Sequence, residues 1–354
     1  MAISTFLRDN KTGKLVFNGA RRFVVPEILT VDGFPSTKEL DDDNGVIAAK
    51  GVFVGAGKVV GGVPATVKQD GPFEAFYLTH RRVMATSGDA AAVGDPDCEG
   101  VLVKITDVGA RNTLMNDWIH CDLIMGNAAM PFVLPETLML EELRSVLWEF
   151  KSINASTKGI WMYPAMVGRK YLRGRATPVG ILDSYISNIL RRQQVSIPFF
   201  YTFDNLGADG TIALAAGTLN QSFFITLASD AAFDWWKFSL LATTPAQLSF
   251  RIRDPETGRE FMNSTIFAPM ACSIGKIGTD NSWSSLYVPG GTAIANPGFL
   301  SGLTPAMAPA IWPEPLFCGR NQKLEVIFDN YDTEINYIYA ALSGRKVFAI
   351  EGMP

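Results

Sequence analysis

The two halves of this chain carry the same sequence blocks in the same order, and this internal repeat constrains its fold more than any other feature. Gaps between the halves fall where turn-forming residues cluster. The paired blocks are Ala56–Phe73 with Ala216–Phe233, Ile105–Ile119 with Ile252–Ile266, Leu134–Leu138 with Trp312–Leu316, and Gly168–Leu172 with Gly344–Phe348. Such a repeat indicates a duplicated structural unit. We therefore predict two copies of one domain, at about residues 50–174 and 208–350.

Apolar residues in the second copy alternate with other residues at a period of two. The alternating sets are Phe223, Ile225 and Leu227; Leu248, Phe250 and Ile252; Leu324, Val326 and Phe328; and Ile335, Tyr337 and Tyr339. Alternation directs one face of a strand to a core and the other face to solvent or to a neighbour. Turn signals separate these runs, for example at Asp254–Gly258, where Pro presets φ and Gly accepts a positive φ. The pattern indicates antiparallel strands.

Several short strands in each copy, without regular intervening helices, are typical of a β-sandwich or jelly roll. We expect an all-β protein with two tandem antiparallel β-sandwich or jelly-roll domains, a connecting helix and an N-terminal arm. The predicted parts are the arm at 1–49, the first domain at 50–176, the connector at 177–197 and the second domain at 198–354. The second domain includes a long loop at 276–310 that is rich in Gly, Pro and Ser.

Two segments show a helical pattern instead. Pro178–Gln194 carries an apolar stripe at helical spacing, which we expect to pack on the edge of a sandwich. The stripe consists of Ile181, Leu182, Tyr185, Ile186 and Ile189. A role of this stripe in binding a partner is the alternative. Pro135–Phe150 also begins like a helix, although its end aligns with the predicted strand Leu324–Phe328.

The composition is that of a globular protein. The chain of 354 residues is 47% hydrophobic and 19% charged, with a formal net charge of -4. This net charge argues against a dedicated nucleic-acid binder. The sequence shows no N-terminal signal pattern and no apolar run of about 18 residues, so it predicts a soluble protein.

Metal chemistry has little support in the sequence. The soft ligands available are the cysteines and histidines Cys98, Cys121, Cys272, Cys318, His80 and His120. No two of the cysteines form a Cys-x-x-Cys pair, so we expect buried thiols from a reducing cytoplasm rather than a zinc site. Asp41–Asp43 lacks the downstream glutamate of a calcium loop, and a solvated turn is expected there.

Motifs for catalysis and for cofactor binding also fail. Gly51–Gly62 lacks the third glycine of a dinucleotide fingerprint and the first glycine of a phosphate loop, so we interpret it as a glycine-rich turn. No Gly-x-Ser-x-Gly elbow occurs. His120 and Cys121 are neighbours and would point to opposite faces of a strand, which prevents a dyad between them. We predict no enzyme, and no catalytic, cofactor-binding or metal-binding residues.

Four segments of the second copy carry a resemblance to known proteins. They are Phe199–Phe203, Ile252–Arg259, Pro313–Leu316 and Ser343–Phe348. Through them residues 198–348 resemble a domain of bacteriophage virion proteins, and the first copy does so more faintly. Two tandem sandwiches in a chain of this length also resemble the double jelly-roll major capsid proteins of tailless phages, by analogy of architecture.

The resemblance implies a virion structural protein that is made in the host cytoplasm and assembles with itself and with other virion proteins. In the double jelly-roll family, trimers form pseudo-hexagonal capsomers, so a homotrimer is one form that the resemblance implies. The long loop at 276–310 would suit an exposed tower or a clasp between subunits. A decoration, collar or tail-associated protein of a tailed phage is the alternative.

Basic residues gather in the arm and at the end of the first copy. They are Arg8, Lys11, Lys14, Arg21 and Arg22, followed by Arg169, Lys170, Arg173 and Arg175. Together they could form an interior face toward packaged nucleic acid or an acidic neighbour. Ordinary solvated charge is the alternative.

Two further classes of function stay open at this point. In a carbohydrate-binding or receptor-binding protein, exposed aromatic residues such as Trp283 and Trp312 would serve as platforms for sugars. In a β-sandwich hydrolase, two acids from distant strands would do the chemistry, and no sequence pattern would show them.

Overall fold

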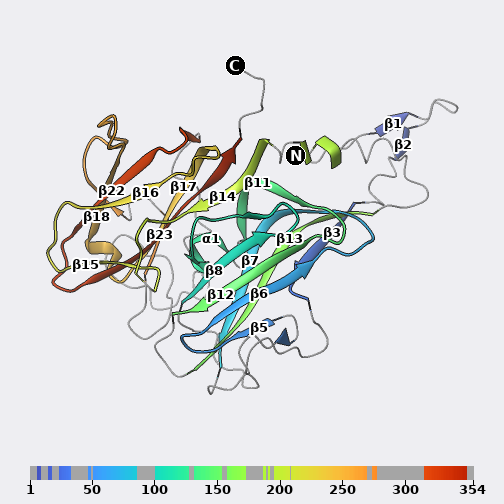
Figure 1. Ribbon diagram of the computed structural model, residues 1–354, viewed down its shortest axis with the longest axis horizontal. Coiled ribbons are helices and arrows are strands. Elements are labelled where there is room, and N and C mark those ends of the chain that lie inside the picture. Colours follow the sequence, from blue (N-terminus) through green and yellow to red (C-terminus); the bar gives the residue numbers. More distant parts are fainter. Residues whose placement is uncertain are drawn as a thin grey trace.

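A computed structural model of the chain (Figure 1) describes residues 6–8, 15–17, 24–32, 47–48, 51–85, 100–126, 131–153, 158–172, 186–188, 190–191, 195–207, 209–268, 273–276 and 315–348. Nearly all of the described elements are strands, and they form two units that lie side by side. A short hairpin of β1 (Phe6–Arg8) and β2 (Leu15–Phe17) precedes the first unit.

The first unit is a sandwich of two antiparallel sheets. One sheet has the order β11-β7-β13-β3, and β5 and β4 extend it beside β13; the other has the order β10-β8-β12-β6, with β9 beside β8. The elements are β3 (Val24–Thr30), β4 (Ile47–Ala48), β5 (Gly51–Val54), β6 (Val59–Thr66), β7 (Phe73–Met84), β8 (Val101–Asp107), β9 (Asn112–Thr113), β10 (Ile119–His120), α1 (Cys121–Ile124), β11 (Phe132–Leu140), β12 (Ser145–Ser152) and β13 (Ile160–Tyr171).

The second unit repeats this arrangement. Its sheets have the orders β21-β17-β23-β14 and β19-β18-β22-β16, with β20 beside β17 and β15 beside β23. The elements are β14 (Ser196–Tyr201), β15 (Ile212–Leu214), β16 (Gln221–Thr226), β17 (Ala232–Ala242), a 3₁₀ helix (Pro245–Gln247), β18 (Leu248–Arg253), β19 (Ile266–Phe267), β20 (Ser273–Lys276), β21 (Leu316–Cys318), β22 (Lys323–Asn330) and β23 (Asn336–Val347).

Eight strands in each unit follow the order of a jelly roll. The eight main strands, in chain order, are β3, β6, β7, β8, β10, β11, β12 and β13 in the first unit and β14, β16, β17, β18, β19, β21, β22 and β23 in the second. Numbered one to eight, they give sheets of order 1-8-3-6 and 2-7-4-5 in both units. In this arrangement consecutive strands pass from one sheet to the other, except strands four and five, which are neighbours in one sheet. Both sheets therefore share one core. The predicted fold class of two tandem jelly-roll-like sandwiches is confirmed.

The repeat blocks occupy matching places in the two units. Thr66 ends β6 and Thr226 ends β16, and each donates both its backbone N–H and its hydroxyl to one aspartate, Asp32 or Asp204. Each of these aspartates follows the first strand of its unit. The match extends to side-chain hydrogen bonds between distant segments, which supports a common origin of the two units.

The Gly-Arg-Lys segment at the end of each copy also has matching contacts. Arg169 pairs with Glu74 at 2.8 Å, and Arg345 pairs with Asp234 at 2.9 Å. Beside each of these ion pairs the strand register shifts at a β-bulge. The shift lies between Val167 and Gly168 in the pairing of β13 with β7, and between Trp235 and Lys237 in the pairing of β17 with β23. A bulge kept at the same place in both copies indicates a feature that the fold needs.

Two predictions about the first domain are wrong. Pro135–Phe150 is not the start of a helix but the strands β11 and β12, joined by a turn in which Leu143 has a φ of 61°. Val146, Trp148 and Phe150 lie two residues apart and are fully buried, so strand geometry sends all three into the core. Val24–Thr30 lies in the predicted arm at 1–49, yet it pairs along its length with β13 as the first strand of the sandwich.

The predicted connector at 177–197 lies partly outside the described residues. Residues 186–188 and 190–191 are helical. Ile186 is buried against Met139 and Tyr171 of the first unit, and Leu190 packs beside them. The described part of the connector therefore covers one edge of the first sandwich. Of the predicted apolar stripe, Ile186 is buried there, and the other four members lie outside the described residues.

The glycine of the repeated Gly-Arg-Lys segment gives a test of the shared packing. A Cβ on Gly344 would lie 2.1 Å from the backbone oxygen of Asp234, and one on Gly168 would lie 2.0 Å from that of Glu74. We expect Gly344→Ala and Gly168→Ala each to lower the free energy of unfolding by about 1–3 kcal/mol. Urea denaturation measures the change. Gly61→Ala, in a strand with no atom closer than 3.8 Å, is the control and should shift it by less than about 0.5 kcal/mol.

Candidate functional site

Few of the residues predicted to form a functional surface lie in the described part of the chain. The residues that lie outside it are Lys11, Lys14, Arg21, Arg22, Arg173, Arg175, Trp283 and Trp312. Asp41–Asp43 and the loop at 276–310, apart from Lys276 at the end of β20, also lie outside it. Arg8 lies on β1. The interior basic face and the aromatic sugar platforms therefore stay predictions.

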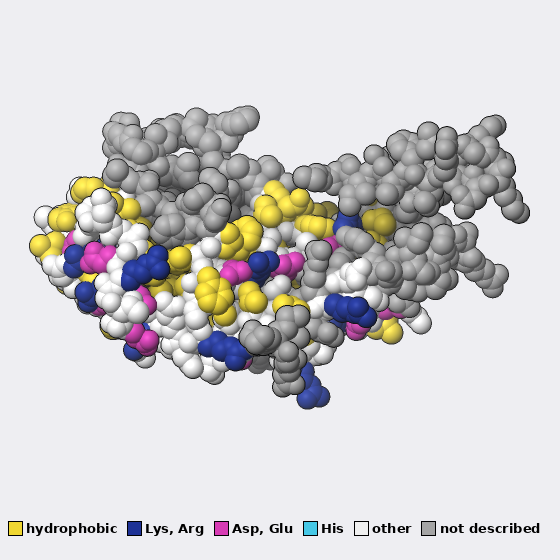
Figure 2. Space-filling model, turned by 90° about the horizontal axis from the view of Figure 1, so that it is seen from above, with side chains coloured by type: hydrophobic (Ala, Val, Ile, Leu, Met, Phe, Trp, Pro, Cys, Tyr) yellow, Lys and Arg dark blue, Asp and Glu magenta, His cyan; other side chains and the backbone are white. Residues whose placement is uncertain are grey.

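Arg169 and Lys170 can be placed, and both are paired with acids. Arg169 binds Glu74, while the buried ammonium group of Lys170 lies beside Asp70 and 3.4 Å from Glu27. Ion pairs of this kind reduce what the two residues add to a basic surface. Figure 2 shows one face of the molecule, on which basic and acidic side chains are interspersed with apolar ones.

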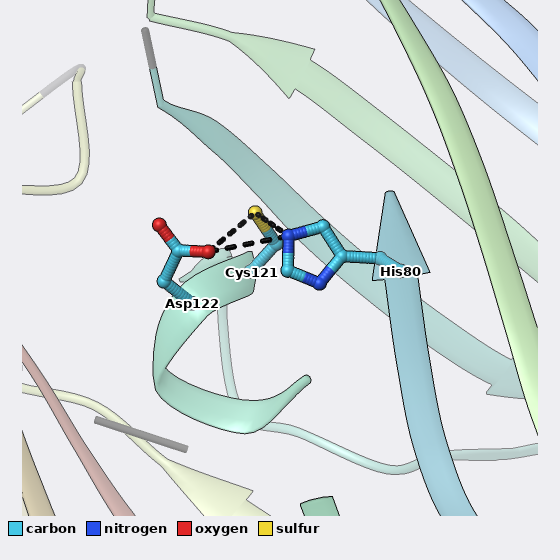
Figure 3. Close-up of side chains that lie close together, drawn as sticks. All are labelled: His80, Cys121 and Asp122. Atoms are coloured by element: carbon cyan, nitrogen blue, oxygen red, sulfur yellow. Dashed lines mark hydrogen bonds and ion pairs between the residues drawn. The ribbon is translucent and has the colours of Figure 1, made fainter. Parts of the chain in front are cut away.

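A buried cluster of chemically active side chains lies where β7 meets α1 (Figure 3). His80 Nε2 lies 3.2 Å from Asp122 Oδ1 and 3.6 Å from Cys121 Sγ, and this sulfur lies 4.0 Å from Asp122 Oδ1. Arg82 forms an ion pair with Asp122 Oδ2 at 2.7 Å and donates a hydrogen bond to Cys121 Sγ at 3.3 Å. His80 and Arg82 are two residues apart on one strand, so both point to the same side of the sheet.

Local structure holds the cluster in place. His120 ends β10 and caps α1 by accepting a hydrogen bond from the backbone N–H of Asp122 through Nδ1, at 3.2 Å. His80 Nδ1 lies 3.2 Å from the carbonyl oxygen of Gly126, which follows α1 and forms a bridge with Thr79 of β7. Both ring nitrogens of His80 thus have fixed neighbours.

Burial and charge act in opposite directions on the cluster. Burial alone would lower the pKa of His80, but the negative charge and hydrogen bonds of Cys121 and Asp122 outweigh it and raise that pKa to about 9. Burial would raise the pKa of Asp122, yet Arg82 and His80 hold it below its ordinary value. Burial lowers the pKa of His120 to about 3, so this ring stays neutral.

The cluster does not have the geometry of a Cys-His-Asp catalytic triad. In a triad one ring nitrogen of the histidine faces the nucleophile and the other faces the acid. Here His80 Nε2 faces both Cys121 and Asp122, while Nδ1 faces a backbone carbonyl. The donor atoms instead surround one point, which is the arrangement of ligands around a metal ion.

Sequence reasoning missed this cluster. It compared His120 with Cys121, which are adjacent in the sequence, and did not combine either residue with His80. The spacing of His80 and Arg82 predicts a shared strand face, and this signal was present in the sequence. That α1 lies under this face depends on how β7 and α1 pack, and no local pattern shows it.

The junction between the two units buries the outer face of the second unit's larger sheet. Phe200, Leu241, Tyr339 and Ala341 belong to the core cluster of the first unit, although they come from β14, β17 and β23. The ring of Tyr339 lies 5.0 Å from that of His120, and Phe200 lies 5.6 Å from Phe132. We call this contact the junction.

Backbone and polar groups fix the junction further. Asn116 and Thr202 exchange two hydrogen bonds through the Asn116 side chain, at 2.9 and 3.1 Å. The backbone N–H of Phe200 donates to the carbonyl oxygen of Leu114 at 2.9 Å. Glu136 of β11 accepts from Arg345 of β23 at 3.1 Å. The two units are therefore joined through specific pairs as well as apolar packing.

Comparisons with known proteins add little. No family model matches the chain, and no curated protein matches it. N-glycanase F is similar in structure, with 9% identity, a TM-score of 0.35, and coverage of 92% of this chain and 96% of that one. A protein from Eubacterium rectale has 10% identity, a TM-score of 0.20, and coverage of 92% of each chain. Vicilin from Solanum lycopersicum (tomato) has 7% identity, a TM-score of 0.11, and coverage of 88% and 83%.

At these TM-scores the likenesses support no argument about function. Among the described residues, no helix combines the length and apolar character needed to cross a bilayer. The functional interpretation therefore depends on the geometry of the junction and of the buried cluster.

Lys237 gives the junction a pH dependence. It is 5% exposed and its ammonium group lies 5.5 Å from the ring of Phe132, and burial lowers its pKa to about 7. Because this pKa lies below the ordinary value of 10.5, the unfolded chain keeps the proton longer. The free energy of unfolding should therefore rise with pH between about 7 and 10.5, by up to about 1.4 kcal/mol per pH unit.

Lys237→Met tests this expectation, since it keeps the length of the side chain and removes the titrating group. We expect the difference in unfolding free energy between the variant and the wild type to favour the variant at pH 7 and to shrink toward pH 10. Urea denaturation at several pH values measures it. A difference that stays constant with pH would contradict the assigned protonation.

Proposed function

We propose that this protein is a self-assembling virion structural protein, a capsid component of the double jelly-roll type without a catalytic role. The observation that carries the proposal is a sheet face that is covered by a partner in the second unit and open in the first. Because the two units share one fold, the open face has the same strand arrangement as the covered one, which suits a partner of the same kind.

The two faces can be compared residue by residue. In the second unit, Lys237, Ser343 and Phe200 form a row across β17, β23 and β14, and they are 5%, 1% and 0% exposed. We call it the junction row. The matching row of the first unit is Tyr77, Val167 and Ile28, which Val133 extends onto β11. We call this the open row.

The open row is apolar across four strands. Val133 is 65% exposed, Ile28 59% and Tyr77 36%, and Val167 is half-buried between Tyr77 and Ile28. Contiguous apolar side chains on a sheet face favour an interaction site over a solvated surface. The row has no charged member, whereas the covered junction row includes Lys237. Along this row the first unit thus presents to solvent side chains at least as apolar as those buried in the second.

The surface that would cover the open row is also exposed. At the junction, His120 at the end of β10 contacts Tyr339 of the second unit. The residue at the matching place in the second unit is Phe267 at the end of β19, and it is 46% exposed. The counterpart of Tyr339 in the first unit is Tyr163. Phe267 of one copy would therefore contact Tyr163 of the next, as His120 contacts Tyr339 within the chain.

Such a contact joins unlike surfaces of two copies, head to tail. Heterologous contacts close into rings when the rotation per copy permits, and otherwise they form open filaments. Three copies would place six jelly rolls in one ring, which agrees with the trimeric capsomer that the resemblance implies. This arrangement supports a shell component over a decoration, collar or tail-associated protein, or a carbohydrate-binding protein.

Charged substitutions at the two surfaces test the proposal. We expect wild-type protein to form a discrete oligomer at high concentration, measured by analytical ultracentrifugation. Ile28→Arg and Phe267→Arg should each weaken assembly at least about tenfold, because a charge in a desolvated contact costs more than about 1.4 kcal/mol. Leu219→Arg, at a residue 56% exposed away from both surfaces, is the control and should assemble normally.

Mixing the two variants distinguishes a head-to-tail contact from a symmetric one. Each variant keeps the surface that the other has lost, so an equimolar mixture should form dimers and nothing larger. In a symmetric contact between two open rows, Phe267→Arg would dimerise by itself, Ile28→Arg would not, and mixing them would form no additional complex. A wild-type protein that stays monomeric at high concentration, also together with other virion components, would overturn the proposed function.

A further inference from the structure

The buried cluster of His80, Cys121 and Asp122 calls for an explanation that the fold does not supply. The second unit has the same fold, and Leu240, Ala242 and Ala268 stand at the places of His80, Arg82 and Cys121. All three are fully buried members of the second core. A jelly roll of this kind therefore packs well without polar groups at this point.

Burying such a cluster costs free energy that an apolar core would not. The free-energy cost of desolvating ionised side chains is offset only when the ion pairs have good geometry and every charged group has its hydrogen-bond partners. Replacement of buried ion pairs by apolar side chains is often neutral or stabilising. The first unit thus buries a destabilising polar cluster where the second unit buries aliphatic side chains. This contrast favours a specific role for the cluster.

We propose that His80, Cys121 and Asp122 form a binding site for a divalent transition-metal ion, zinc by its ligand chemistry. A tetrahedral zinc ion holds sulfur at about 2.3 Å and nitrogen or oxygen at about 2.0–2.1 Å, so its donor atoms lie roughly 3.3–3.6 Å apart. The three distances between donors here are 3.2, 3.6 and 4.0 Å. The side chains need to move by only a few tenths of an ångström to bind the ion.

The surroundings of the three donors match those of metal ligands. A histidine ligand usually directs its other ring nitrogen to a carbonyl or carboxylate, and His80 Nδ1 faces the carbonyl oxygen of Gly126 at 3.2 Å. The two carboxylate oxygens of Asp122 have different neighbours, since Oδ2 forms the ion pair with Arg82 while Oδ1 faces the other two donor atoms. Arg82 would act as an outer-shell partner that holds the thiolate and the carboxylate.

The charge of the site also suits a divalent cation. A metal-bound cysteine is a thiolate and a metal-bound histidine is neutral. Together with the carboxylate of Asp122, these ligands would carry two negative charges, which balance the two positive charges of the ion. Three protein ligands leave one coordination position for water. The ion would link β7 to α1, which itself packs on β17 and β23 at the junction.

Cobalt(II) tests the proposal, because a cysteine thiolate bound to cobalt gives a charge-transfer absorption. The full chain would be stripped with a chelator and titrated with Co²⁺, then with Zn²⁺. We expect one equivalent of Co²⁺ with the thiolate band, and loss of the band when Zn²⁺ displaces it. Absence of stoichiometric binding in the wild type would show an ion-pair cluster only and would overturn the proposal.

Cysteine variants show which thiol binds the ion. Cys121→Ser should lose the band and weaken metal binding more than about 100-fold, since loss of an outer-shell partner alone costs about 10–100-fold. Cys318→Ser is the matched control, because that thiol is also free and buried but lies in the second core. It should keep the band.

A second variant keeps the test decisive if Cys121→Ser fails to fold. The triple variant Cys98→Ser, Cys272→Ser and Cys318→Ser leaves Cys121 as the one cysteine in the chain. This protein should show the full cobalt spectrum with one equivalent of metal. A band that disappears from the triple variant, or persists in Cys121→Ser, would assign the metal to another site and contradict the proposal. Neither result depends on whether the protein assembles.

Discussion

The burial of one sheet on both of its faces is the constraint on which this structure depends. In the second unit, β14, β17 and β23 bury Tyr201 and Leu342 toward their own core and Phe200 and Tyr339 toward the first unit. Every residue of β14 is buried. Strands covered on both sides carry nearly continuous apolar runs instead of a simple alternation. The first unit supplies the missing cover, so the second sandwich depends on its neighbour to complete its burial.

This dependence connects the fold to the proposed function. Each of the two units carries both kinds of surface that meet at the junction. The contact within the chain covers one surface of each unit, so one copy of each kind of surface remains uncovered. The unused surfaces here are the open row with Tyr163 and the end of β19 with Phe267. Assembly of several chains would use them. The same physical contact would then join domains within a chain and chains within a particle.

Divergence between the copies is as informative as their likeness. Both units have a Thr-Asp hydrogen bond, at Asp32 and Asp204, and an ion pair between an arginine and an acid, at Arg169 and Arg345. Each of these contacts stabilises a turn or a strand that the jelly roll needs. Among the described residues of the second unit, the polar cluster formed by β7 and α1 has no counterpart. Features needed by the fold recur in both copies, so a costly feature present in one copy indicates a specialised role.

Much of the fold could be predicted from the sequence. The repeat blocks and the period-two alternation predicted two all-β units, and turn residues such as Gly258 predicted where strands end. The second unit's strands at Leu248–Ile252 and Leu324–Phe328 put the expected side chains into the core. Local patterns were misleading where helix and strand propensities compete, as in Pro135–Phe150, because cross-strand pairing with β6, β7 and β8 outweighs the local preference.

The sequence by itself determined that the chain folds as two copies of a sandwich, since both the repeated blocks and the period-two alternation can be recognised from the order of residues along the chain. Only the tertiary structure decided which outer face is buried and which is open, since both faces of a strand can be equally apolar in sequence. It also decided that His80 meets Cys121 and Asp122. These residues lie on segments about 40 positions apart, and their approach follows from packing β7 against α1. Contacts between distant segments depend on the geometry of the whole core, which no local pattern encodes.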